Sequence, residues 1–219
     1  MTKAVLCLFL FFLIFSAVSL RVLLSLSLGI FEEATLLISL VPLAAFYFYL
    51  RKYRIYNSGW TGKKQVAKLL RSKLSDDYIL INYLYLRNGG GDIDHSVLGP
   101  SDVFVLETKN WRGTITRHDD EWQRASKQCF GSSSLQVKRN VSKIKHIIDS
   151  SPTLRSLEVM VEGIVVFTNN HATLHLNNPT VLILKLPQLP NHITTYRSRG
   201  NYSSQQLEAI GSEILRQKG

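Results

Sequence analysis

The first 50 residues of this 219-residue chain are almost free of charge, which restricts what the chain can fold into more than any other feature. The charged side chains among them are Lys3, Arg21, Glu32 and Glu33. The uncharged runs Ala4–Leu20 and Ala34–Leu50 approach the roughly 17–25 apolar residues that a membrane-spanning helix needs. The first run is long enough if it continues past Arg21, whose guanidinium can extend to the interface. We therefore expect a membrane anchor over residues 1–54, with transmembrane helices at about 4–28 and 34–50.

The charges around these two runs predict how the anchor is oriented. Positive residues flank the outer ends, Lys3 on one side and Arg51, Lys52 and Arg54 on the other, whereas Glu32 and Glu33 lie between the runs. Cytoplasmic ends of membrane helices are enriched in Lys and Arg. The pattern predicts a helical hairpin in the cell inner membrane, in contact with the lipid bilayer, with residues 55–219 in the cytoplasm. A signal peptide cleaved after Ser19 is the alternative, and it leaves those residues on the same side.

Residues 55–219 have the composition of a globular domain with an anionic partner. They hold 21 Lys and Arg against 14 Asp and Glu, a formal net charge of +7. The apolar content of the chain, 45%, is too high for a disordered protein, and 13 Gly and 2 Cys exclude collagen-like and disulfide-scaffold classes. The excess positive charge favours nucleic acid as the partner. The candidate nucleic-acid contacts are Lys63, Lys64, Lys68, Arg112 and Lys143, although an ordinary solvated surface accounts for each of them equally well.

The apolar periodicity of residues 55–219 predicts alternating helices and strands. After a short linker at 57–62, Thr61 caps a helix to about Leu74, a second helix runs from about Ser132 to Asp149, and a third follows Ser203. The expected strands are Tyr78–Leu86, Asp92–Leu98, Asp102–Lys109, Val161–Phe167 and Thr180–Leu186, with a hairpin formed by Gly113–Arg117 and Glu121–Arg124. Val161–Phe167 is nearly all apolar and is expected inside the sheet. The fold class is therefore α/β, a mixed sheet flanked by helices.

Charged residues stand at the end of an otherwise apolar predicted strand. Side chains alternate along a strand, so Glu107 and Lys109 share one face with Val103 and Val105. Asp94, on the preceding strand, can lie close to Glu107 when the two strands pair. Two carboxylates suit a hard cation such as Mg²⁺, and a neighbouring lysine can orient water or stabilise charge on a phosphate. The spacing alone leaves a solvated edge strand as the competing interpretation.

Two segments of the chain resemble a known family. Glu-Thr-Lys-Asn-Trp-Arg-Gly at 107–113 is similar to the signature of the nuclease-related domain, NERD, and Asp-Ile-Asp-His at 92–95 is similar to the motif upstream of it. The resemblance covers about residues 57–190 and includes Gly59, Gly62, Trp122 and Leu135-Gln136. The family is similar to the PD-(D/E)XK nucleases in fold and motif. The resemblance implies that Asp94 and Glu107 bind metal, that Lys109 is the catalytic lysine, and that Gln136 assists.

The resemblance implies a metal-dependent nuclease, with DNA as the expected substrate and Mg²⁺ or Mn²⁺ as the cofactor, and the uncharged N-terminal runs add the expected membrane anchor. One position departs from the family, because Lys63 stands where the family usually has an acidic residue after the second glycine of the first helix. If that carboxylate helps to hold metal, catalysis here is weaker. A catalytically weak or inactive nucleic-acid-binding module tethered to the membrane is therefore the alternative, and an interaction domain without hydrolytic activity is a third.

Overall fold

The computed structural model describes residues 31–87, 91–124, 127–128, 131–196 and 200–219, and before them residues 9, 11–13, 15–16, 19–20 and 22. The chain divides into two compact units, Met1–Asn57 and Ser58–Gly219. Every residue that the sequence singles out for chemistry or nucleic-acid binding belongs to the second unit.

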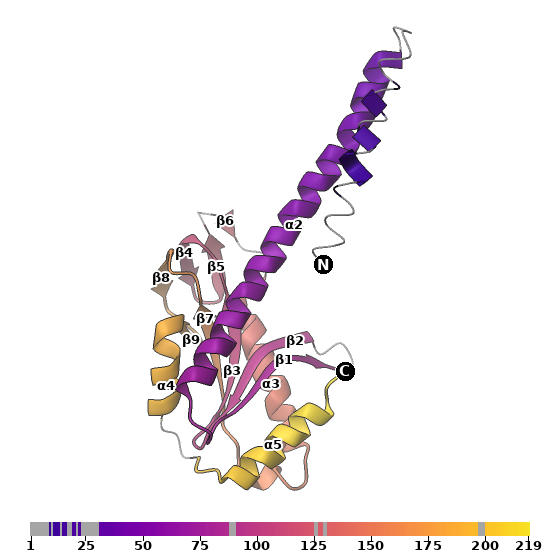
Figure 1. Cartoon of the computed structure of the whole chain (residues 1–219). Helices are drawn as coiled ribbons and strands as arrows, with labels where there is room; N and C mark the ends of the chain where they lie inside the picture. Colours follow the sequence, from indigo (N-terminus) through magenta and orange to yellow (C-terminus); the bar gives the residue numbers. More distant parts are fainter. Residues whose placement is uncertain are drawn as a thin grey trace. The chain divides into compact units, whose positions relative to one another are not determined.

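Helices and strands follow one another in the second unit in nearly the predicted order (Figure 1). The strands are β1 (Ile79–Leu86), β2 (Gly91–Leu98), β3 (Val103–Lys109), β4 (Gly113–His118), β5 (Glu121–Arg124), β6 (Lys127–Gln128), β7 (Val161–Phe167), β8 (Ala172–Asn177) and β9 (Leu182–Lys185). The helices are the last part of α2 (Phe31–Lys73), α3 (Ser133–Asp149), α4 (Leu189–Thr195) and α5 (Ser204–Arg216), with 3-10 turns at Arg155–Leu157 and Leu186–Gln188. The predicted capping box of α5 is present between Ser203 and Gln206.

A five-stranded mixed sheet forms the centre of the second unit, in the order β1-β2-β3-β7-β9. The first three strands pair antiparallel, whereas β3, β7 and β9 pair parallel. Strand β7 lies between β3 and β9, and its alternate residues pack against helices on the two faces of the sheet, which explains why its sequence is nearly all apolar. The predicted α/β class with a mixed sheet is confirmed.

The predicted hairpin belongs to a second sheet that the sequence did not indicate. Strands β4 and β5 pair with β6 and β8 in the order β6-β5-β4-β8. Strand β8 was missed although Ala172, Leu174 and Leu176 alternate with polar residues, a pattern that favours a strand. Helix α4 was missed because it is only one or two turns long and begins next to a proline.

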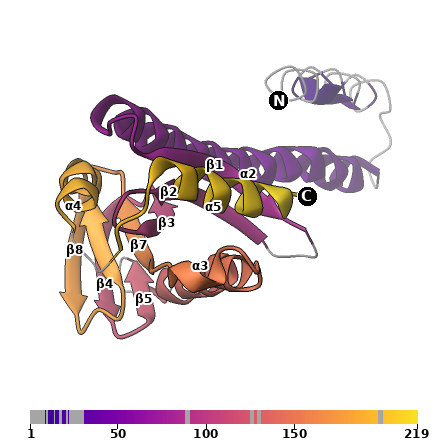
Figure 2. The same cartoon turned by 90° about the horizontal axis from the view of Figure 1, so that it is seen from below.

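Helices cover both faces of the five-stranded sheet. On one face, Val66 and Leu70 of α2 pack with Phe104 and Leu106 of β3 in a buried cluster that also includes residues of α4. On the other face, buried residues of α3 and α5 pack against the alternate residues of β3. Figure 2 shows the last part of α2 and helix α3 on opposite sides of β3. The alternation predicted for β3 is thus present, with one apolar set on each face.

The predicted linker at 57–62 is wrong, because these residues are helical. Helix α2 runs from Phe31 to Lys73, so that the helices expected at 34–50 and 61–74 are parts of one element. Glycine costs about 1 kcal/mol relative to alanine inside a helix, which is why Gly59 and Gly62 predicted a break. Tertiary packing at Gly62 overrides this local preference.

The predicted membrane anchor finds no support in the structure. Most of its first span, about residues 4–28, falls outside the described residues. Within the part of the chain that the structure describes, no helix combines the length and the apolar character that crossing a membrane requires.

Gly62 allows α2 to approach the ends of β3 and β7 closely. A Cβ atom placed there would lie 2.8 Å from Oγ1 of Thr168 and 3.0 Å from Cβ of Asn110. At the same contact, the Asn110 side-chain amide donates to the Ser58 carbonyl at 2.9 Å. Because Lys63 follows directly, this close approach also determines where Lys63 meets the sheet.

Gly62→Ala is expected to destabilise the domain, whereas Gly59→Ala is not. A methyl group at position 62 would push against Thr168. Overpacking of this kind costs about 1–3 kcal/mol, and the higher helix propensity of alanine offsets about 1 kcal/mol of that cost. A Cβ at position 59 would have no neighbour within 4 Å, so the same change there should stabilise the helix. Chemical denaturation measures both variants. Equal free energies of unfolding would contradict the close approach.

Candidate active site

Asp94 and Glu107 come from neighbouring antiparallel strands. The pairing of β2 with β3 ends at His95 and Leu106, and Asp94 and Glu107 are the next residues on the two strands. Both carboxylates are buried, with 3% and 2% of their surface exposed. Buried carboxylates are costly unless they are paired, so the contacts of each one matter.

Lys109 lies on the same face of β3 as Glu107. Its Nζ is 2.5 Å from Oε1 of Glu107 and donates to Oε1 of Gln136, in the first turn of α3, at 3.3 Å. The Trp111 ring lies 5.8 Å from the same ammonium group. The structure therefore brings together Glu107, Lys109 and Gln136, three of the four residues that the sequence singles out for catalysis.

Both carboxylate oxygens of Asp94 are engaged. Oδ2 accepts a hydrogen bond of 2.8 Å from the backbone N–H of Thr108, which ties β2 to β3 and orients the side chain. Oδ1 is 2.6 Å from Nζ of Lys63. Lys63, expected from the sequence as a nucleic-acid contact, thus forms an ion pair inside the candidate site.

Burial and the surrounding charges set the ionisation of the site. Burial raises the pKa of the Glu107 carboxyl to about 7; Lys109 opposes this rise and Asp94 adds to it. Burial lowers the pKa of the Lys63 ammonium, but the attraction of Asp94, Glu107 and Asp92 outweighs it, so that this pKa lies above its ordinary value. An ionised Glu107 is only partly compensated by its neighbours, and added positive charge beside it would be favourable.

The oxygen atoms of the site fit a hard divalent cation. Oε2 of Glu107 is buried and has no hydrogen-bond partner among the described residues. Oδ1 of Asp94 would become a second ligand if Lys63 moved away. Among the described residues no group of three or more His, Cys, Asp or Glu side chains could hold a metal. Water and a substrate phosphate would have to complete the coordination, which is common for Mg²⁺.

Other polar residues near the carboxylates join elements of the fold. Nδ1 of His95 is 2.6 Å from Oδ1 of Asn82, on β1. Burial lowers the pKa of His95 to about 4, so the ring is neutral at pH 7. Nδ2 of Asn140 donates to the Asp92 carbonyl at 3.3 Å and joins α3 to β2.

The residues predicted to contact nucleic acid come from different elements of the fold. Lys64 and Lys68 line a pocket of about 360 Å³ beside α2. Arg112 is exposed after β3, and Lys143 is partly buried on α3. Neither of them lines that pocket. Lys63 pairs with Asp94 in the carboxylate site. Lys64 and Lys68 are thus the two predicted contacts that line the same pocket.

Some features of the site could not be read from side-chain patterns. Thr108 acts through its backbone N–H. Tyr83, within β1, has a φ of 56°, and its ring lies 4.7 Å from that of Trp60. A left-handed tyrosine inside a strand has no sequence signal. Trp122 fixes the hairpin to α3, because it is 2% exposed and its Nε1 donates to Oγ of Ser134 at 3.1 Å.

Comparison with known proteins gives a family match for the second unit. The family model described as the nuclease-related domain, NERD, matches residues 58–168, just over half of the chain, from the start of the second unit to the end of β7. The matched segment contains Asp94, Glu107, Lys109 and Gln136. No curated protein and no solved structure matches the chain. The chain belongs to the nuclease-related domain family.

Proposed function

We propose that the protein is a metal-dependent nuclease that hydrolyses phosphodiester bonds of nucleic acid, with DNA as the expected substrate. Membership of the nuclease-related domain family supports a nuclease-related function in general. The observation that carries the proposal is the meeting of Asp94, Glu107 and Lys109 at one end of two paired strands. A structural role alone does not require two buried carboxylates and a lysine together.

Each residue has a separate role in the proposed reaction. Asp94 and Glu107 would hold Mg²⁺ or Mn²⁺, and the bound ion would act as a Lewis acid toward the scissile phosphate. Lys109 would orient the attacking water or stabilise negative charge on the phosphate, because its ammonium is fixed before the substrate arrives. Gln136 would hold the free end of Lys109 in place. Thr108 keeps Asp94 turned toward the site through its backbone N–H.

A substrate panel tests the proposal. The full-length protein is incubated with plasmid, linear duplex, single-stranded DNA and RNA, with Mg²⁺, Mn²⁺ or EDTA. We expect cleavage of DNA that depends on the metal and stops in EDTA. Absence of cleavage on every substrate with either metal would contradict the proposal and favour the binding module.

A catalytically weak binding module is the second candidate, and one contact favours it. Nζ of Lys63 is 2.6 Å from Oδ1 of Asp94, so a positive charge of the protein already occupies one predicted metal ligand. A divalent ion must compete with this ammonium for Asp94. Metal affinity, and with it the rate of cleavage, would then be low in the wild-type protein.

Lys63→Ala is expected to lower the stability of the metal-free protein and to increase its response to metal. Loss of the ion pair leaves Asp94 buried without its cation, which should lower the thermal midpoint by about 2–4 °C for each kcal/mol lost. Metal that fills the vacated position should raise the midpoint more than in the wild type. Thermal denaturation with and without Mn²⁺ measures both effects, with the exposed neighbour Lys64→Ala as the control. An equal metal-induced rise in the three proteins would contradict the competition.

Membrane attachment is a separate proposal that rests on the charges of residues 1–54. Lysine and arginine residues flank the two uncharged runs, and Glu32 and Glu33 lie between the runs. This charge pattern favours a hairpin with residues 55–219 in the cytoplasm. Cysteine labelling in a background without Cys7 and Cys129 tests it. Labelling of a cysteine at position 57 by an impermeant reagent in intact cells would contradict this topology.

A further inference from the structure

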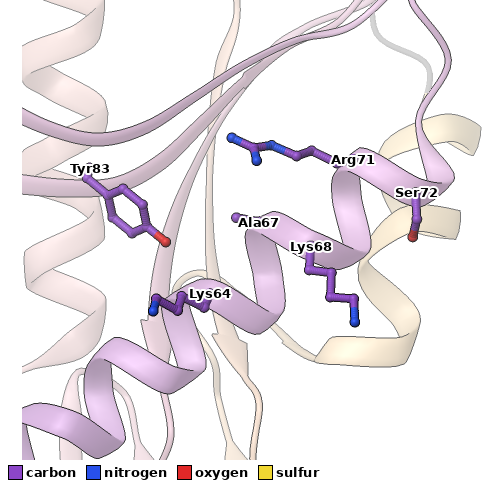
Figure 3. A pocket seen from close by; sticks show the side chains of 6 residues that line it. All are labelled: Lys64, Ala67, Lys68, Arg71, Ser72 and Tyr83. Carbon is purple, nitrogen blue, oxygen red and sulfur yellow. The ribbon is translucent and has the colours of Figure 1, made fainter.

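A pocket of about 360 Å³ lies between α2 and β1 (Figure 3). Its lining residues, which define the α2–β1 pocket, are Lys64, Ala67, Lys68, Arg71, Ser72 and Tyr83. The Tyr83 hydroxyl points toward the end of Lys64, and the Arg71 side chain extends over Ala67 from the other side. The pocket is open to solvent, and Ala67 contributes only a methyl group to its lining.

No carboxylate in the described part of the chain neutralises the positive charge of the α2–β1 pocket. Lys64, Lys68 and Arg71 are exposed, and among the described residues none of them forms an ion pair with a carboxylate. Lys68 lies four residues after Lys64 and three before Arg71, so their like charges repel one another on the helix surface. A bound anion would relieve this repulsion. Phosphate suits such a site, because Arg and Lys both donate charge-assisted hydrogen bonds to its oxygens.

An exposed aromatic pair adjoins these cations. The rings of Trp60 and Tyr83 lie 4.7 Å apart, and Nζ of Lys64 lies 5.2 Å from the Trp60 ring. Tyr83 is 37% exposed, and its φ of 56° is a strained backbone conformation for a non-glycine residue. The strand pairs normally on both sides, Asn82 with His95 and Leu84 with Ile93. The strain is therefore confined to the residue that presents its ring to the pocket.

The α2–β1 pocket is next to the carboxylate site. The register of β1 and β2 sets Tyr83 opposite Asp94. On α2, Lys63 contacts Asp94, and the following residue, Lys64, lines the pocket. A strand with one phosphate at the carboxylates would therefore carry a neighbouring nucleotide across the pocket.

We propose that the α2–β1 pocket is a subsite for one nucleotide of a single-stranded nucleic acid. Lys64, Lys68 and Arg71 bind its phosphate, and the base stacks on Trp60 and Tyr83. The base must be unpaired, because stacking on side chains requires an exposed base face. The Ser72 hydroxyl plays no part, since it donates to the Leu69 carbonyl at 2.9 Å. This inference rests on the proposed function and specifies which form of the substrate the site accepts.

Binding in EDTA tests the subsite without any cleavage. The full-length protein is titrated with a fluorescent single-stranded 20-mer and with the same sequence as a duplex, and anisotropy gives the affinities. Tyr83→Asn should weaken single-strand binding by about tenfold, because it removes one of the two aromatic rings on which the base stacks. Asparagine tolerates the left-handed conformation, so thermal stability should not fall. Tyr85→Ala, at an exposed tyrosine on the same strand outside the pocket, is the matched control and should bind as the wild type does.

Arg71→Ala tests the phosphate contact. It should weaken binding of the single strand and reduce the slope of log affinity against log salt by about one phosphate contact. Lys73→Ala, an exposed lysine on the same helix outside the pocket, is the control.

Two outcomes would overturn the proposal. One is equal single-strand affinity for Tyr83→Asn and Tyr85→Ala. The other is that Arg71→Ala and Tyr83→Asn leave nucleic-acid binding unchanged but weaken binding to vesicles of anionic lipid, which would make the pocket a headgroup site. Because these titrations contain no metal, a protein that shows the expected losses but never cuts nucleic acid would contradict the proposed function and leave the subsite standing. If the wild type cuts DNA but Tyr83→Asn binds the single strand as tightly as the wild type does, the subsite is contradicted and the proposed function stands.

Discussion

Glu107→Gln is expected to abolish divalent-metal binding and nuclease activity together. The amide keeps the shape of the carboxyl group but has no charge, and hard cations bind carboxylate oxygens in preference. The fold should tolerate the change, because burial already raises the pKa of Glu107 to about 7 and a neutral side chain costs less to bury. Calorimetric titration with Mn²⁺ and cleavage of labelled DNA measure the two effects. The rate should fall by at least about 10³-fold, the upper end of what the loss of one preorganised charge costs.

Two further variants are compared with Glu107→Gln, one as a control and one at the second predicted ligand. Asp92→Asn changes an exposed carboxylate on the same strand as Asp94 and should bind metal and cut as the wild type does. Asp94→Asn should lose activity like Glu107→Gln but should also lose stability, because it removes the charge that pairs with Lys63. A folded Glu107→Gln protein that binds Mn²⁺ with wild-type affinity would contradict the assignment of Glu107 as a ligand.

The ionisation of Glu107 should make the proposed metal binding depend on pH. A metal ion needs the ionised carboxylate, so below the Glu107 pKa of about 7 a proton competes with it. The apparent affinity for Mn²⁺ should fall by about tenfold for each pH unit below that value and should level off above it. An affinity that stays constant from about pH 5.5 to pH 8 would show that Glu107 is not the titrating ligand.

Lys109→Met is expected to slow cleavage by about 10²–10³-fold while leaving metal affinity nearly unchanged. The methionine side chain has a similar length but no ammonium, so the protein loses the charge that Glu107 and Gln136 hold in place. Neither predicted metal ligand is altered, which separates this variant from Glu107→Gln. Single-turnover cleavage and Mn²⁺ titration of the same preparation give both quantities.

Two further substitutions test whether the loss of rate is specific to the positive charge at position 109. Lys73→Met, an exposed lysine on α2, should cut at the wild-type rate. Lys109→Arg keeps the charge and should recover part of the rate, because a guanidinium can still contact Glu107. If Lys109→Met lost metal affinity in proportion to its rate, the role of Lys109 would be structural.

The alternation of side chains made the central part of the site predictable. Asp94, Glu107 and Lys109 follow from the faces of two paired strands, and the strands themselves follow from their apolar residues. The ion pair of Lys63 with Asp94 could not be predicted in this way. It depends on how closely α2 approaches the sheet, and that distance is set by the missing side chain of Gly62 against Thr168 and Asn110.

The misplaced helix boundary has the same physical origin. Gly59 and Gly62 read locally as a linker, but α2 continues through them because Gly62 packs against the ends of β3 and β7. Strand β8 was overlooked although its residues alternate between apolar and polar, and its pairing with β4 joins segments that are distant in the sequence. Such long-range contacts leave little trace in local pattern.

Metal-dependent cleavage by the wild type and by Glu107→Gln, compared side by side, tests the central claim most directly. Both full-length proteins are purified in the same way and incubated with labelled DNA in Mg²⁺, Mn²⁺ or EDTA, with circular dichroism to show that both are folded. We expect cleavage by the wild type in metal only, and none by Glu107→Gln. Equal cleavage by the two folded proteins would contradict the proposal that Asp94, Glu107 and Lys109 form the active site.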